Sequence, residues 1–413
     1  MIVTSRSDTA APVEDLSADD AARELGVTLA TLYAYVSRGL LRSRAEPGTR
    51  RRRYVAEDVW LLRQRKEQRR DPARTAEEAL HQGLPAIESR LSLIRDGRLY
   101  YRGRDVLTLA VSHTLEQVAA LLWAGDLDAP LPEDPLPSPS PEWKALLRIA
   151  ATVPPLEAFQ LVMPLLAARD SGAYDFQPIS VQRIGLKIVR ILAAAAVGRR
   201  PSRDETAEVL QRGWTTTSAS DRALLRAALV LYADNGINPS SFTARCVASA
   251  GSTPYALVLA GLAALQGTKH GGACERAEAL LEEAGDATGA RRVVEARLRR
   301  GEAIPGFGHP LYPAGDPRGA LLLQLVSEQH GRARDVGLAS SLVHAVRDLT
   351  GLMPNVDFGV VTLCRALRLP PGSSLALLGI GRTVGWIAHG LEQYQEARLI
   401  RPRARYSGEP PPG

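Results

Sequence analysis

The chain has 413 residues, of which 45% are hydrophobic and 23% are charged, values typical of a soluble globular protein and not of a disordered one. Its longest apolar run, residues 255–265, is about half of the roughly 20 residues that span a bilayer. The first 17 residues have no apolar core of the kind that a signal peptide needs. Three widely spaced cysteines (Cys246, Cys274, Cys364) predict neither a disulfide framework nor a zinc site. We therefore expect a cytoplasmic protein without a membrane span, a metal or a cofactor.

The formal net charge of +6 is concentrated in one stretch of the chain. Residues 38–74 carry thirteen arginines or lysines against five acids, a balance of +8, so the remaining residues sum to −2. Basic charge gathered on one segment is typical of a surface that binds a polyanion.

Two short helices are predicted before this basic stretch. Ser17 is placed to cap a helix over residues 18–25, which Gly26 ends, and Thr28 is placed to cap a second helix through Arg38. Two short helices joined by a tight glycine turn are typical of a helix-turn-helix.

A basic strand over residues 50–55 and a third helix over residues 57–70 follow, and the whole segment resembles the winged helix-turn-helix of MerR- and excisionase-type DNA-binding proteins. Duplex DNA is the partner that this resemblance implies. The residues expected to meet its phosphates or its groove are Arg50, Arg51, Arg52, Arg53, Thr28, Thr31 and Tyr33. The alternative is a solvated, arginine-rich helical hairpin that contacts another protein.

A β-hairpin is predicted within residues 91–106, because two β-type runs flank Asp96-Gly97, a favoured two-residue turn. Helical sequence dominates afterwards, as the 3.6-residue apolar period over residues 181–195 illustrates. Six prolines within residues 130–141 predict an extended surface loop.

Glycine occurs beside titratable residues in four later clusters. His270 (residues 267–273) precedes a helix-forming run, so the positive helix end favours its neutral form, which can donate to a carbonyl. The glycines before His309 (residues 304–308) let the backbone approach a ligand closely.

The other clusters add a carboxylate and arginines. Asp316-Pro317-Arg318 has the pattern of a helix start, Asp357 lies where another helix opens, and Arg382 and Arg401 follow. Taken singly, each residue has a plainer interpretation, as a structural histidine, a helix cap or a surface charge.

Together and in this order, the motifs resemble the citrate synthase family over about residues 84–408. The segments that carry the resemblance are IESRLSLIRDGRLYYRGRDV, NPSSFTARCVASAGS, GTKHGGA, IPGFGHPLYPAGDPR, NVDFGVV and RTVGWIAHGLEQ…LIRPRARYSG.

The resemblance implies the roles of the site residues. His270 would hold the enol of an acyl-CoA, Asp357 would remove the proton alpha to its thioester, and His309 would polarise or protonate the keto group of a 2-oxo acid. The residues implied to bind the oxo acid are Arg318, Arg382 and Arg401. Arg401 would come from the other subunit, so the resemblance implies a homodimer with shared active sites. The residues implied to contact coenzyme A are Ile304, Pro305, Gly306, Phe307 and Gly308.

The fold implied is mainly α. A winged helix-turn-helix domain (residues 1–74) would precede a large helical domain with a short hairpin (75–273 and 368–413) and a small helical domain (274–367) that closes on binding.

One departure from the family pattern lies in the expected oxo-acid pocket. Asn235 occupies the place of the family's histidine in Asp-His-Glu, and Gly236 that of the acid. Losing a charge-assisted hydrogen bond costs about 1.5–3 kcal/mol, although the Asn235 amide still donates. Cys274 stands where the family often has asparagine.

Three functions remain open on the sequence. The first, which we favour, is condensation of acetyl-CoA with oxaloacetate or a similar 2-oxo acid, a reaction of the tricarboxylic acid cycle. The second is the same chemistry with propionyl-CoA, as in 2-methylcitrate formation. The third is a DNA-binding regulator whose synthase-like body senses a metabolite.

Overall fold

The computed structural model describes residues 15–45, 52–55, 58–59, 62, 87–133, 136, 141–214, 218–402 and 407–409. The chain divides into two compact units, residues 1–88 with 401–413 and residues 89–400. Seventeen helices and five short strands lie in the described stretches, so the prediction of a mainly α fold is confirmed. None of the helices in these stretches is long and apolar enough to cross a membrane.

The first two predicted helices are present in the first unit. α1 (Ala18–Leu25) begins after Ser17, whose side chain accepts from the backbone of the first turn, and ends at Gly26, which has a left-handed φ of 57°. α2 (Leu29–Ser37) begins after Thr28, which caps it in the same way. Local capping chemistry therefore determines both helix starts.

The predicted basic strand is also present in part. β2 (Arg52–Tyr54) pairs antiparallel with β1 (Ser43–Ala45). Arg50 and Arg51 lie outside the described residues, as does most of the predicted third helix, of which residues 58, 59 and 62 are helical. The small core of this unit consists of Ala21, Ala22, Leu25, Leu32, Leu41, Tyr54 and Val59.

The predicted hairpin opens the second unit. β3 (Ser92–Arg95) pairs antiparallel with β4 (Arg98–Tyr101) across Asp96-Gly97. Both turn residues have positive φ, 51° and 70°, as a type I′ turn requires. β5 (Arg104–Asp105) adds a third strand beyond β4. The turn dipeptide therefore set the strand register, and the prediction is confirmed.

The rest of the second unit is helical. The described part of the proline-rich stretch, residues 130–133 and 136, has neither helix nor strand, as predicted. The helices are α5 (Val106–Ser112), α6 (Leu115–Ala124), α7 (Pro141–Ala150), α8 (Pro155–Arg169), α9 (Pro178–Ala196), α10 (Thr206–Gly213), α11 (Ala219–Tyr232), α12 (Pro239–Ser249), α13 (Pro254–Leu265), α14 (Gly272–Ala284), α15 (Gly289–Arg299), α16 (Pro317–His330), α17 (Arg334–Thr350), α18 (Val356–Ala366) and α19 (Ser373–Glu396).

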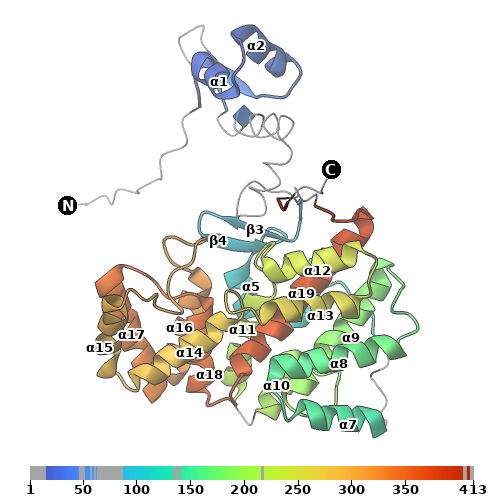
Figure 1. Cartoon of the computed structure of the whole chain (residues 1–413), viewed down its shortest axis with the longest axis vertical. Coiled ribbons are helices and arrows are strands. Elements are labelled where there is room, and N and C mark those ends of the chain that lie inside the picture. Colours follow the sequence, from blue (N-terminus) through green and yellow to red (C-terminus); the bar gives the residue numbers. More distant parts are fainter. Residues whose placement is uncertain are drawn as a thin grey trace, which may run out of the picture. The chain divides into compact units, whose positions relative to one another are not determined.

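The long helix α19 is the centre of this unit. It packs against α6, α8, α9, α11, α12 and α13, and in Figure 1 α14 to α18 gather to one side of α11 and α19, with α7 to α10 on the other. Gly385 permits the closest approach, because a Cβ there would lie 2.2 Å from the carbonyl oxygen of Ala233. The end of α11 can therefore lie directly against α19.

Candidate active site

Asp357 lies in the first turn of α18, at the helix start that the sequence predicts. The Asn355 side chain caps this helix, and its Oδ1 accepts from the backbone N–H groups of Asp357 and Phe358 at 3.1 and 3.2 Å. The carboxylate itself receives two side-chain donors on one oxygen. Tyr232 Oη donates to Asp357 Oδ1 at 2.8 Å, and Cys274 Sγ donates to the same oxygen at 3.4 Å.

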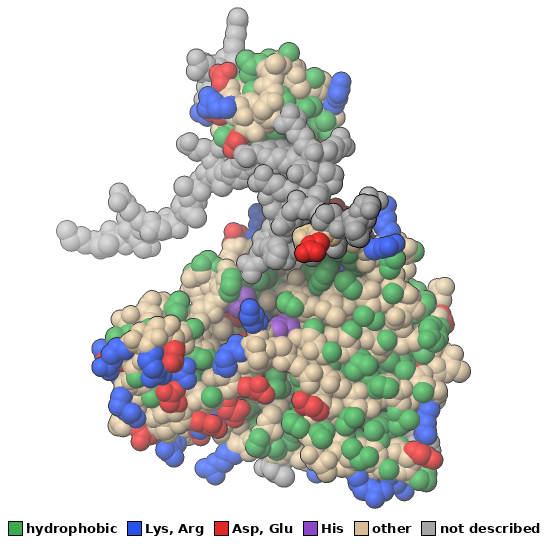
Figure 2. All heavy atoms as spheres, in the orientation of Figure 1, with side chains coloured by type: hydrophobic (Ala, Val, Ile, Leu, Met, Phe, Trp, Pro, Cys, Tyr) green, Lys and Arg blue, Asp and Glu red, His purple; other side chains and the backbone are tan. Residues whose placement is uncertain are grey.

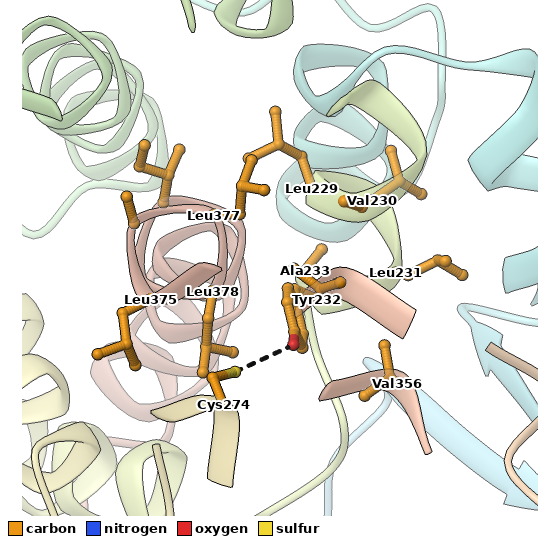
Figure 3. Close-up of a cluster of buried hydrophobic side chains, with 14 of the residues drawn as sticks. Leu229, Val230, Leu231, Tyr232, Ala233, Cys274, Val356, Leu375, Leu377 and Leu378 are labelled. Atoms are coloured by element: carbon orange, nitrogen blue, oxygen red, sulfur yellow. Dashed lines mark hydrogen bonds between the residues drawn. The ribbon is translucent and has the colours of Figure 1, made fainter. Parts of the chain in front are cut away.

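The two donors come from different helices and contact each other. Figure 3 shows the hydroxyl of Tyr232, at the end of α11, turned toward the thiol of Cys274, in the first turn of α14, within a cluster that includes Leu375 and Leu378. Burial raises the pKa of both groups well above its ordinary value, and the charge of Asp357 adds to the effect. Both groups therefore keep their protons and act as donors.

His270 lies directly before α14, next to its N-cap residue. Burial, with the nearby charge of Arg382, lowers the pKa of His270 to about 4. Its Nε2 lies 2.9 Å from the Ser240 Oγ in α12, which also accepts a hydrogen bond from Trp386 Nε1 at 3.2 Å. The imidazole is therefore neutral near pH 7, with its Nε2 held by a serine.

A second group of polar side chains is built around Arg318, at the start of α16. Its guanidinium donates to both oxygens of Asp316 at 2.9 and 2.8 Å, and Arg318 and Asp316 are both buried. Asp316 also accepts from the backbone N–H of Val356, at the start of α18. Although burial disfavours the charged guanidinium, the Asp316 carboxylate raises the pKa of Arg318 above its ordinary value.

Two aromatic rings adjoin this arginine. Arg318 lies over the Tyr312 ring, 5.0 Å from its centroid, and the His309 ring lies 4.9 Å from the same tyrosine. Burial and the charge of Arg318 lower the pKa of His309, which favours a neutral imidazole. Tyr312 Oη donates to Asn235 Oδ1 at 3.1 Å, so the amide N–H groups of Asn235 remain available as donors.

Arg382 lies in α19 and is buried. Its Nε donates to the backbone carbonyl of Tyr232 at 2.8 Å, and burial lowers its pKa. Two residues beyond Tyr232, Asp234 accepts from Ser92 Oγ at 2.6 Å and lies 3.2 Å from His389 Nε2. Burial alone would raise the pKa of Asp234, but His389 and Arg382 lower it overall.

Ile304–Gly308 lies against the start of α18. Gly308 N–H donates to the Met353 carbonyl at 2.8 Å, Asn355 N–H donates to the Gly306 carbonyl at 2.9 Å, and the Phe307 and Phe358 rings lie 4.7 Å apart. Gly306 has a φ of 82°, and a Cβ there would lie 3.0 Å from Phe358 Cβ. This segment and Asp357 are therefore positioned by one set of backbone hydrogen bonds. The contact of this segment, Pro305 included, with coenzyme A stays a prediction.

The contacts bring most of the candidate residues into one group. Tyr232 links Asp357 to Arg382, and Asp316 links Arg318 to the helix that carries Asp357. The charge of Asp357 acts to raise the pKa of His309, and the charge of Arg382 acts to lower the pKa of His270. Figure 2 shows histidine side chains at the surface of this unit next to lysine or arginine.

Arg401 is not part of this group as the structure describes it. It is exposed and belongs to the unit formed by residues 1–88 and 401–413. Its expected action on the site of a second subunit stays a prediction. In the described residues, no group of three or more His, Cys, Asp or Glu is placed to hold a metal ion.

The first unit contains the residues expected to meet DNA. Thr28 Oγ1 caps α2 and lies 3.0 Å from Thr31 Oγ1, while Tyr33 is 52% exposed. Arg52 and Arg53 are both exposed on β2. Arg53 donates to the Asp15 carbonyl at 3.2 Å, and Arg52 donates to Ser43 Oγ at 2.9 Å. Tyr33, Arg52 and Arg53 are therefore exposed on the surface of this unit.

Two protein families match the sequence in consecutive regions. The family described as MerR HTH family regulatory protein matches residues 16–71. The family described as citrate synthase, C-terminal domain, matches residues 79–403, well over half of the chain. The chain belongs to the citrate synthase family.

Individual relatives agree with this assignment. The citrate synthase of Haloferax volcanii is 32% identical over 366 residues, covering 79% of this chain and 95% of that protein. The 2-methylcitrate synthase of Mycobacterium tuberculosis (strain H37Rv) is 30% identical over 334 residues, covering 75% and 84%. The crystal structure of citrate synthase from Pyrobaculum aerophilum has a TM-score of 0.67 and 26% identity, covering 80% and 92%. The chain is therefore a citrate synthase family protein with an N-terminal MerR-type helix-turn-helix.

Sequence reasoning did not single out several residues of this group. Ser240 follows the Asn238-Pro239 helix start, a cap pattern that could have drawn attention to the neighbouring hydroxyl. Tyr232 belongs to an apolar helical run, and nothing in that run distinguishes its hydroxyl. His389 lies one turn beyond Gly385 in α19, and its contact with Asp234 spans 155 positions.

Proposed function

We propose that this protein condenses an acyl-CoA, in the first place acetyl-CoA, with oxaloacetate or a related 2-oxo acid and releases coenzyme A. The observation that carries the proposal is a carboxylate, Asp357, held on one oxygen by two donors, in one group with the neutral imidazole of His270 and two buried guanidinium groups. Removing a proton alpha to a thioester needs such a base together with a hydrogen-bond donor for the enolate oxygen.

The first half of the reaction uses Asp357 and His270. Asp357 takes a proton from the carbon alpha to the thioester, and the electron pair moves toward the carbonyl oxygen. His270 donates a hydrogen bond to that oxygen. The structure has the Ser240 hydroxyl donating to Asn238 Oδ1 at 2.8 Å. For His270 to donate from Nδ1, the Ser240 hydrogen must turn from Asn238 to His270 Nε2, which lies 2.9 Å from the same oxygen.

The second half forms the carbon–carbon bond. The enol carbon attacks the keto carbon, and the neutral imidazole of His309 donates a hydrogen bond to the keto oxygen as negative charge develops there. The resulting alkoxide takes up one proton, which balances the proton that Asp357 removed. Arg318 and Arg382 pair with the carboxylates of the oxo acid, since guanidinium groups bind carboxylates bidentately. Arg401 of a second subunit completes this pocket in a homodimer, and Asn235 donates to the same acid. Water then cleaves the thioester and releases the thiol of coenzyme A.

The same residues support condensation of propionyl-CoA, since a 2-methylcitrate synthase is about as similar to this chain as the citrate synthases are. A pocket discriminates one methylene by only about 1–3 kcal/mol. The ratio of kcat/KM for acetyl-CoA and propionyl-CoA decides between the two activities.

The test is thiol release by the purified protein across a small matrix of acyl-CoAs and oxo acids. We expect thiol from acetyl-CoA or propionyl-CoA only when an oxo acid such as oxaloacetate is present. No thiol release from any common pair would overturn the proposal.

A second function is carried by the first unit. We infer that residues 16–71 bind double-stranded DNA through α2 and β2, because exposed arginines adjoin a helix-turn-helix and guanidinium groups neutralise phosphates. Binding assays over a range of salt, with and without acyl-CoA and oxo acid, test this function. Ligand-modulated DNA binding with negligible turnover would favour a metabolite-sensing regulator over an enzyme.

A further inference from the structure

Tyr232 makes two polar contacts that join opposite parts of the candidate active site. Its hydroxyl donates to Asp357 Oδ1 at 2.8 Å, and its backbone carbonyl accepts from Arg382 Nε at 2.8 Å. The residue lies at the last position of α11 and its side chain is fully buried. Asp357, the expected base, and Arg382, expected to bind the oxo acid, are therefore both hydrogen-bonded to Tyr232.

Cys274 adds a second donor to the same carboxylate oxygen. Its Sγ lies 3.4 Å from Asp357 Oδ1 and 3.5 Å from Tyr232 Oη. It lies four residues after His270, in the first turn of α14. Figure 3 shows the Tyr232 hydroxyl and the Cys274 thiol facing each other. An ionised carboxylate can only accept, so the hydroxyl and the thiol both orient their hydrogens toward Oδ1.

We propose that Tyr232, assisted by Cys274, is a positioning residue that fixes the Asp357 carboxylate, so that Oδ1 is occupied and Oδ2 is presented to the carbon alpha to the thioester. The inference rests on the proposed condensation. A carboxylate with one oxygen held by two donors is limited in its rotation about the Cβ–Cγ bond. Proton abstraction depends on this orientation, because small displacements of a reacting group reduce rates strongly.

Both donors keep their hydrogens throughout the neutral range. Burial is the main cause that raises the pKa of Tyr232 and of Cys274, and the adjacent carboxylate acts in the same direction. The thiol is therefore a donor and not a nucleophile in this position. The cluster positions the base and takes no proton from the substrate.

The test is Tyr232→Phe, which removes one hydroxyl and keeps the ring. We expect kcat for thiol release to fall roughly 10- to 100-fold, with the KM values for acetyl-CoA and oxaloacetate within about twofold of the wild type. The deuterium isotope effect on kcat with trideuterated acetyl-CoA should rise, because proton abstraction becomes the slow step. A general loss of folded enzyme would lower kcat without changing the isotope effect.

Tyr255→Phe is the matched control. Tyr255 is a buried tyrosine that donates to an aspartate elsewhere, Asp170 Oδ2, at 2.6 Å. Its loss should leave kcat and the isotope effect at their wild-type values. Comparable effects of the two substitutions would overturn the inference.

Cys274 provides an independent variant if Tyr232→Phe does not fold. Cys274→Ala should lower kcat severalfold and raise the isotope effect, while Cys274→Ser, which retains a donor, should restore most of the rate. Unchanged kinetics in Cys274→Ala and in a folded Tyr232→Phe would overturn the positioning role. If the wild-type protein itself releases no thiol, the proposed condensation is wrong, and this outcome is distinct from an active wild type with insensitive variants.

Discussion

Replacing Ser240 by alanine tests how the His270 imidazole is held. Ser240 is wholly buried, and its Oγ lies 2.9 Å from His270 Nε2 and 3.2 Å from Trp386 Nε1. Alanine leaves His270 Nε2 and Trp386 Nε1 without this partner and also removes the hydrogen bond that Ser240 donates to Asn238 Oδ1. An unsatisfied buried polar group costs about 1–3 kcal/mol. If the cost of the lost hydrogen bond to His270 raises the free energy of the transition state by this amount, kcat drops roughly 5- to 150-fold, since about 1.4 kcal/mol is tenfold in rate.

Ser241→Ala supplies the comparison for this variant. Ser241 is the adjacent buried serine, and its Oγ has no hydrogen-bond partner among the described residues. We expect its kcat and its free energy of unfolding to stay near wild-type values. Thiol release and denaturant unfolding of the two variants are the measurements. A kcat for Ser240→Ala within twofold of the wild type would refute the reasoning about His270.

Three further predictions concern stability and DNA binding. Asp316→Asn should lower the free energy of unfolding by about 3–5 kcal/mol, because it leaves the buried charge of Arg318 unpaired. Asp335→Asn, in the partly exposed Asp335–Arg365 pair, should lower the free energy of unfolding by about 1 kcal/mol or less. Equal losses of stability in the two variants would contradict the argument. Burial lowers the pKa of His270 to about 4, so the unfolded state binds more protons and the free energy of unfolding should rise with pH between about 4 and 6.5. His270→Gln should flatten this slope when unfolding is measured across pH. An unchanged slope in the variant would contradict the prediction. Arg52→Ala with Arg53→Ala should weaken DNA binding and reduce its salt slope by about one per lost phosphate contact, whereas Arg23→Ala, on α1 and paired with Asp20, should change little.

The elements set by local chemistry were predictable from the sequence. Asp96-Gly97 defines its hairpin because both positions need positive φ. Ser17 and Thr28 define two helix starts because their side chains accept from the first turn. In each case the decisive contacts lie within a few residues of one another.

The interior of the candidate site depends on contacts that no local pattern encodes. The contact between Tyr232 and Asp357 spans 125 positions, and the Ser240–His270 contact joins α12 to the start of α14. Resemblance to the family supplied the expected roles of Asp357 and His270. It did not supply Tyr232, because a hydroxyl inside an apolar helix differs from its neighbours only once the fold brings it to a carboxylate.

Asn235 stands where the family has a histidine, and its contact with Tyr312 explains this difference in part. Tyr312 donates to its Oδ1 at 3.1 Å, which leaves the amide hydrogens for a ligand. The sequence indicated that this amide still donates, but not which tyrosine orients it. The contact depends on the segment after His309 lying beside the end of α11.

Thiol release by wild-type protein and by Asp357→Asn, each with and without oxaloacetate, tests the central claim most directly. Asparagine retains the size of the side chain but cannot accept the proton from the acetyl carbon. The account predicts oxaloacetate-dependent release of coenzyme A by the wild type and a loss of at least a hundredfold, on the order expected for a removed general base, in the variant. Equal rates of thiol release from the two proteins would contradict it.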